Sequence, residues 1–111
     1  LGVDIQKETP DRFHVAERCF SEQEQALIRK QGPEMFTRIW AMKESYLKFT
    51  GQGIRVPLNS FEVLPDERTL PVFFQEFTLE GYRIALCSEE PLDTPLEILS
   101  SEELLCPSTA F

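Results

Sequence analysis

The feature that most constrains the fold is one long amphipathic segment bounded by helix-breaking residues. Gly32-Pro33 precedes this segment and Gly51-Gln52-Gly53 follows it, which predicts a helix over residues 34–50. At about 100° per residue, its large apolar side chains gather into one broad arc that would face the core. They are Met35, Phe36, Ile39, Trp40, Met42, Tyr46 and Leu47. The same helix carries the polar residues on which the functional interpretation depends.

The other segments predict a small α+β domain with a small antiparallel sheet, this long helix and shorter helices. Apolar residues alternate over residues 1–5 as in a strand, and residues 10–19 resemble a short helix. Ser21 and Glu24 have the spacing of a capping box at the start of another helix. Further strands are expected at residues 61–64, 72–79, 82–87 and 97–99, with a turn at Glu80-Gly81 and a capped turn at residues 101–105.

Length and charge exclude several classes of protein. A chain of 111 residues forms one domain, here expected over residues 1–106 with a flexible tail at 107–111. No apolar run reaches the roughly 18–20 residues that span a bilayer, so we expect no membrane partner. A net charge of −8 opposes binding to nucleic acid. The chain begins at Leu1, within an expected strand, which indicates a fragment or a trimmed chain.

The cysteines indicate a reducing compartment. Cys19, Cys87 and Cys106 are odd in number and widely separated, and they form no metal-binding spacing with His14. We therefore expect free thiols and a cytoplasmic location.

Three polar residues of the long helix are candidates for a functional site. Lys43 lies in the middle of the apolar arc, where its ammonium either extends past its stem to water or points at an anion within a cleft. Glu44 and Lys48 lie one turn apart at the edge of the arc. They form either a surface salt bridge of a few tenths of a kcal/mol or two groups directed at a common point.

Asp4 provides independent support for a site, because aspartate is rare in strand interiors and this one lies between aliphatic residues. A buried carboxylate needs a cation or a proton. Asp4 and Glu44 would together suit Mg²⁺, which commonly takes one or two carboxylates and completes its octahedron with waters and substrate phosphates. With two nearby lysines, this set suggests phosphoryl-type chemistry.

Several motifs together resemble the 4′-phosphopantetheinyl transferase superfamily. They are Gly2-Val3-Asp4-Ile5, Phe20-Ser21-x-x-Glu24, the WxxKExxxK string over residues 40–48, and Gly51-Gln52-Gly53. Residues 82–87 and 101–105 are similar to the end of the surfactin-synthetase-type branch. Members of that branch have two fused α+β halves with coenzyme A and Mg²⁺ between them, and this chain resembles the C-terminal half. The resemblance therefore implies a second half-domain, or a homo-oligomer partner, that completes the site.

The resemblance also implies an activity and residue roles. The phosphopantetheine arm of coenzyme A, the substrate, would move to a serine of an acyl or peptidyl carrier protein, releasing adenosine 3′,5′-bisphosphate. Asp4 and Glu44 would hold Mg²⁺, and Glu44 would also take the serine proton. Lys43 and Lys48 would contact phosphates, with Lys48 assisting the leaving group. Glu24 would lie near the metal's water shell or the attacking serine, unless its side chain serves only the capping box.

One departure and one alternative remain. Many surfactin-type members have a second acid two residues after the aspartate, where this chain has Gln6, whose amide oxygen could still ligate the metal or hold a water. The alternative function is a non-catalytic module that binds carrier proteins, or a half that is inactive without its other half. A binding module would not need a desolvated aspartate beside a cation-rich helix, so the transferase is favoured.

Overall fold

The computed structural model describes residues 1–7, 13–52 and 56–91. The strand expected at 97–99, the turn at 101–105, Cys106 and the tail at 107–111 lie outside the described residues. The elements, in chain order, are β1 (Gly2–Lys7), α1 (Phe13–Cys19), α2 (Glu22–Gln31), α3 (Pro33–Thr50), the 3₁₀ turn η2 (Leu58–Ser60), β2 (Phe73–Leu79) and β3 (Tyr82–Ser88).

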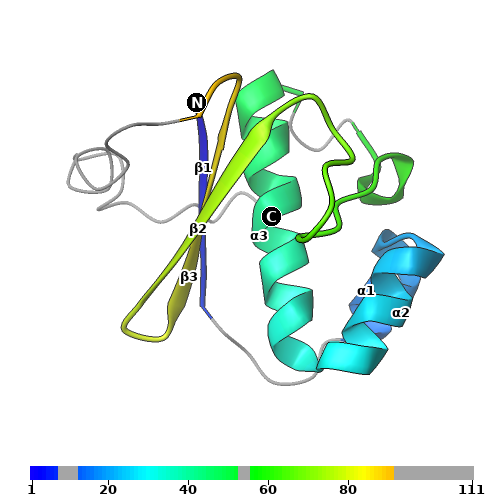
Figure 1. Cartoon of the computed structure of the whole chain (residues 1–111). Helices are drawn as coiled ribbons and strands as arrows, with labels where there is room; N and C mark the ends of the chain where they lie inside the picture. Colours follow the sequence, from blue (N-terminus) through cyan, green and yellow to red (C-terminus); the bar gives the residue numbers. More distant parts are fainter. Residues whose placement is uncertain (8–12, 53–55, 92–111) are drawn as a thin grey trace.

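The three strands form one antiparallel sheet in the order β1-β3-β2. β2 and β3 make a hairpin through Glu80-Gly81, both of which have positive φ, as the tight turn requires. β1 pairs with the other side of β3, so that Asp4 lies opposite Ala85. One face of the sheet packs on α3, and α1 and α2 lie on the far side of α3 (Figure 1). The expected α+β fold with a small sheet and a long helix is confirmed.

The helix boundaries follow the capping residues that the sequence indicated. Ser21 Oγ accepts the Glu24 backbone N–H at 3.2 Å, and the Ser21 N–H donates to Glu24 Oε1 at 2.8 Å, which completes the capping box of α2. Pro33 begins α3, where the absence of an N–H costs nothing. Gly51 ends it in the left-handed conformation and donates its N–H to Leu47 O.

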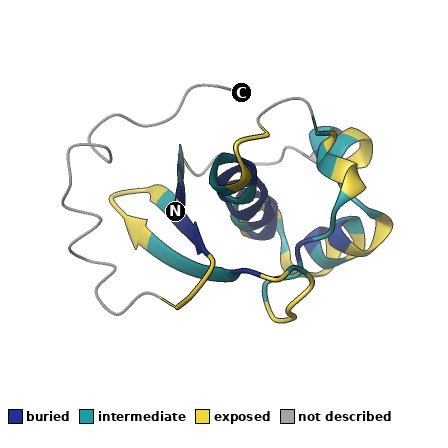
Figure 2. Cartoon of the chain, turned by 90° about the horizontal axis from the view of Figure 1, so that it is seen from above, coloured by how far each residue is buried: buried dark blue, intermediate teal, exposed yellow. Residues whose placement is uncertain are grey.

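The long helix is buried on more sides than one apolar arc would predict (Figure 2). Towards α1 and α2, Phe36 packs with Phe20 and with the half-buried Trp40, whose ring lies 5.7 Å from that of Phe36. Towards the sheet, Met42 packs in a second cluster with Ala85. Because α3 lies between two layers, it also buries three consecutive polar residues, Lys43, Glu44 and Ser45.

The expected strand at residues 61–64 is wrong. These residues join none of the three described strands, and Leu64 makes only an isolated bridge with Glu67. Phe61 O and Val63 N instead bond to buried side chains of α2 and α3. Alternating apolar residues are compatible with this outcome, because the segment still buries Val63 while its backbone groups find side-chain partners.

The described residues include two of the three cysteines and the helices that could be compared with a membrane span. Cys19 and Cys87 are free thiols, as expected, and burial raises the pKa of Cys87 to about 12. In the described parts of the chain, every helix is too short or too polar to cross a bilayer.

Candidate functional site

The site forms where β1 lies directly against α3, and Gly2 makes this approach possible. A Cβ atom at Gly2 would lie 1.9 Å from Ser45 O and 2.6 Å from Phe49 N, both of which are backbone atoms. No side chain fits such a gap without moving the strand from the helix. Because side chains alternate along a strand, the residue two positions on, Asp4, faces α3 as well.

Asp4 is 1% exposed and is held by two hydrogen bonds. Lys48 Nζ donates to its Oδ1 at 2.7 Å, and Gln6 Nε2 donates to its Oδ2 at 2.7 Å. Burial raises the pKa of Asp4, while the bonds from Lys48 and Gln6 oppose the rise. Gln6 thus presents its amide N–H₂, rather than its oxygen, to this carboxylate.

Glu44 lies beside this pair and is fully buried. Neither of its carboxylate oxygens has a hydrogen-bond partner among the described residues. Burial, and after it the charge of Asp4, raise the pKa of Glu44 to about 7, although Lys48 opposes the rise. The simple surface salt bridge between Glu44 and Lys48 is therefore not formed, because Lys48 bonds to Asp4.

Lys48 forms the solvent side of the site. Its side chain is 24% exposed, whereas that of Asp4 is 0% exposed. A ligand that approaches from solvent would therefore meet the Lys48 side chain before the two carboxyl groups. The structure brings together three of the expected residues, namely Asp4, Glu44 and Lys48.

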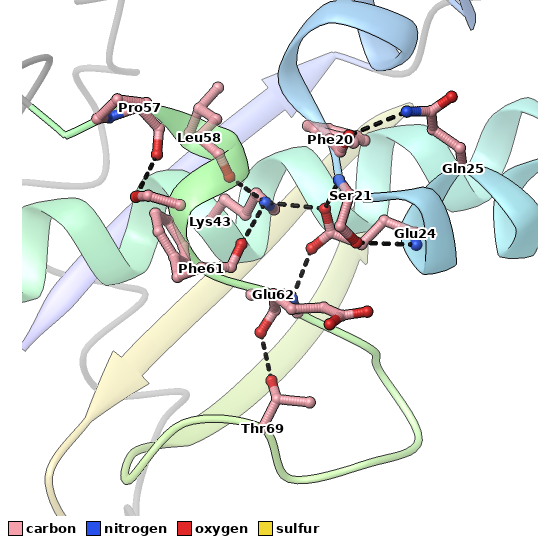
Figure 3. A network of polar contacts seen from close by, with 12 residues as sticks. Phe20, Ser21, Glu24, Gln25, Lys43, Pro57, Leu58, Phe61, Glu62 and Thr69 are labelled. Carbon is pink, nitrogen blue, oxygen red and sulfur yellow. Dashed lines mark hydrogen bonds and ion pairs between the residues drawn. The ribbon is translucent and has the colours of Figure 1, made fainter.

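Lys43 and Glu24 lie together elsewhere, on the side of α3 that faces α2 (Figure 3). Both residues are 0% exposed, and Lys43 Nζ lies 2.9 Å from Glu24 Oε1. Burial lowers the pKa of Lys43, and the bond that its ammonium donates to Glu24 opposes this change. Lys43 neither extends to water nor points at an open cleft, since its anion is a carboxylate of this same chain.

The Asp4–Glu44 pair has the donor chemistry of a divalent-cation site. Two adjacent buried carboxyl groups, one of them without hydrogen bonds, leave oxygen lone pairs that a hard cation would satisfy. The described residues contain no group of three or more histidine, cysteine or acidic side chains placed to hold a metal. Two protein carboxylates suffice for Mg²⁺ when waters and substrate phosphates supply the other ligands. The residues therefore fit Mg²⁺.

Two features of this region were not expected from the sequence. The close approach at Gly2 is one, although a glycine inside a strand is a known sign of such contact. The other is the set of backbone groups in residues 58–63 that surrounds Lys43 and Glu24. No side-chain pattern in the sequence indicates backbone partners.

Comparison with known proteins identifies the family. The model of the 4′-phosphopantetheinyl transferase superfamily matches residues 1–94. The chain belongs to this superfamily. Relatives include the 4′-phosphopantetheinyl transferases ffp and Sfp of Bacillus subtilis, which are 37% and 36% identical to it over 95% of this chain and 54% of each relative. These matches also confirm the resemblance to the surfactin-synthetase-type branch.

A more distant relative comes from a mammal. The L-aminoadipate-semialdehyde dehydrogenase-phosphopantetheinyl transferase of Mus musculus is 31% identical over 71% of this chain and 30% of the relative. The chain thus spans about half the length of the two Bacillus relatives and less of the mouse protein.

Proposed function

We propose that this chain supplies the metal-and-lysine side of an active site that transfers the 4′-phosphopantetheine arm of coenzyme A. The acceptor is a serine of an acyl or peptidyl carrier protein. The observation that carries the proposal is Glu44, a fully buried carboxyl whose oxygens lack hydrogen-bond partners among the described residues, next to the buried Asp4. A module that only bound carrier proteins would not need such a costly group.

Asp4 and Glu44 are the residues proposed to hold Mg²⁺. When bound, the ion would supply positive charge to the pyrophosphate oxygens of coenzyme A. Asp4 already faces the ammonium of Lys48 at 2.7 Å, which orients its carboxylate. This arrangement leaves Glu44 free to ligate, since no hydrogen bond from the described residues must first be broken.

The proposed reaction is an in-line displacement at the β-phosphorus. The carrier serine oxygen forms a bond to this phosphorus while the bond to the leaving adenosine 3′,5′-bisphosphate breaks. The serine proton passes to Glu44, a buried carboxylate beside Asp4 and Lys48. Lys48, on the exposed side of the site, offsets negative charge on the leaving phosphate.

The expected roles of Lys43 and Glu24 in contacting phosphate and serine are not carried into this reaction. Both side chains bond to groups of this same chain on the other side of α3. The free thiols Cys19 and Cys87 support a cytoplasmic location for the protein. Because the chain covers 54% of the Bacillus relatives, we also propose that a second half-domain or another copy completes the coenzyme A site.

The test follows both products. The complete protein is incubated with coenzyme A, Mg²⁺ and an apo carrier protein, and the carrier is analysed by mass spectrometry. The proposal expects the carrier to gain one phosphopantetheine arm per molecule, with one equivalent of adenosine 3′,5′-bisphosphate released. A carrier whose reactive serine is replaced by alanine is the matched control. An unmodified wild-type carrier would contradict the proposal.

A further inference from the structure

Lys43 and Glu44 are neighbours in the sequence, yet they serve opposite sides of α3. The Glu44 carboxyl lies on the β1 side, where the charges of Asp4 and Lys48 act on it. The Lys43 ammonium lies on the α2 side, beside Glu24 and residues 58–63 (Figure 3). Adjacent residues on a helix differ by about 100° in direction. Any rotation of α3 about its axis would therefore move both groups together.

The hydrogen-bonding capacity of Lys43 is fully used within the chain. Its ammonium has three protons, and its partners are Leu58 O, Phe61 O at 2.8 Å and Glu24 Oε1 at 2.9 Å. The rings of Phe20 and Phe61 lie 5.1 Å and 4.7 Å from Nζ. No proton remains for a phosphate, and the aromatic rings help to keep water away.

Both carboxylate oxygens of Glu24 are also bonded within the chain. Its Oε1 accepts from the Ser21 N–H at 2.8 Å as well as from Lys43, and its Oε2 accepts from the Val63 N–H at 2.6 Å. The pair therefore joins the start of α2, the middle of α3 and residues 58–63 by directional bonds. The hydrophobic effect is not directional, whereas these bonds are, so they constrain the rotation of α3 on this side.

We propose that Glu24 and Lys43 are a positioning pair that sets the rotation of α3, so that Glu44 faces Asp4. This role rests on the proposed function, because it is through Glu44 that the pair would affect transfer. Catalytic groups must be held within about 0.5 Å and 10–20° of their productive geometry. Lys43 precedes Glu44 in the sequence, and its buried ion pair with Glu24 would hold this part of α3 in place.

The positioning role predicts a kinetic pattern that direct contact with substrate does not. In the complete protein, Glu24→Gln and Lys43→Met each lower kcat by about tenfold to a hundredfold, as expected when a reacting group is displaced. KM for coenzyme A stays within about twofold, and the pH profile keeps its shape. The double variant is no slower than the slower single variant, because either change already disconnects the pair.

The matched control is the other ion pair of α3. Arg38 donates two hydrogen bonds to Glu76 of β2, at 2.9 and 2.8 Å, and its partners do not include residues 58–63. The double variant Arg38→Met with Glu76→Gln removes one ion pair from the same helix and should keep kcat within about threefold. The positioning role would be refuted if Lys43→Met raised KM for coenzyme A severalfold while Glu24→Gln did not. It would also be refuted if the kcat losses of the two single variants multiplied in the double variant.

A second measurement separates this inference from the proposed function. In this 111-residue chain, amide hydrogen exchange at Val63 should become about tenfold faster in Lys43→Met and in Glu24→Gln, but not in the Arg38/Glu76 control. Unchanged amide exchange at Val63 in both single variants would refute the proposal that Glu24 and Lys43 form a positioning pair. If the wild-type protein failed to load any carrier while amide exchange at Val63 changed as expected, the proposed function would be refuted. Glu24 and Lys43 would then have a structural role only.

Discussion

Replacing Glu44 by glutamine tests the electrostatics of the site without requiring turnover. The pKa of Glu44 rises from 4.5 to about 7 in the folded chain. The folded state therefore binds this proton more tightly than the unfolded state. The stabilisation from protonated Glu44 is complete below about pH 4.5 and is lost as the pH rises through about 7.

The size of this change in folding free energy follows from the pKa shift of Glu44. At about 1.4 kcal/mol per pKa unit, ionising Glu44 costs about 3 kcal/mol of folding free energy above pH 8. Between pH 5.5 and 8 the wild-type chain should therefore lose about 2 kcal/mol that Glu44→Gln retains. Asp4, whose pKa is also raised, adds a loss of the same sign that begins at lower pH.

The assay is urea unfolding of the chain at several pH values in EDTA. Glu17→Gln, which removes the charge of an exposed glutamate on α1, is the matched control and should follow the wild-type curve. Adding Mg²⁺ at pH 8 should raise the free energy of unfolding of the wild type and of the control, but not of Glu44→Gln. Parallel pH curves for wild type and Glu44→Gln would refute the reasoning.

Three further predictions concern neighbouring features. Gly2→Ala should lower the free energy of unfolding by about 3 kcal/mol and weaken Mg²⁺ binding, because its Cβ would meet the backbone of Ser45; near wild-type values for both would contradict the close approach. Gln6→Glu should cost about 2 kcal/mol in EDTA by replacing a donor to Asp4 with a like charge, yet tighten Mg²⁺ binding in calorimetry; unchanged Mg²⁺ affinity would mean that residue 6 points away from the ion. The chain alone, where size-exclusion chromatography shows a monomer, should not load a carrier, because one side of a cleft leaves the nucleotide exposed; loading by a strict monomer would refute the need for a second half.

The parts of the structure that depend on local sequence were predictable. Ser21, Pro33 and Gly51 determine where α2 and α3 begin and end, because capping is a short-range effect. The spacing of Glu44 and Lys48 on one helix, with Asp4 on a strand, was sufficient to propose a joint site. The structure places these three side chains together.

The parts that depend on contacts between distant segments were not predictable. A helical wheel placed Lys43 in the buried arc, but it contains no information on which group lies opposite. That group is Glu24, which the capping box had already explained by itself. Likewise, the alternation in residues 61–64 indicates burial on one side but not whether backbone groups pair with a strand or with side chains.

The central claim is that the buried Asp4–Glu44 pair binds the metal that transfer requires, and its most direct test is a rate measurement. The initial rate of carrier loading by the complete protein is measured against Mg²⁺ concentration for wild type, Asp4→Asn, Glu44→Gln and the control Glu17→Gln. The account predicts that wild type and control lose activity in EDTA and regain it with Mg²⁺. It predicts that the two site variants stay inactive at every Mg²⁺ concentration. Loading at near wild-type rate by either site variant would contradict it.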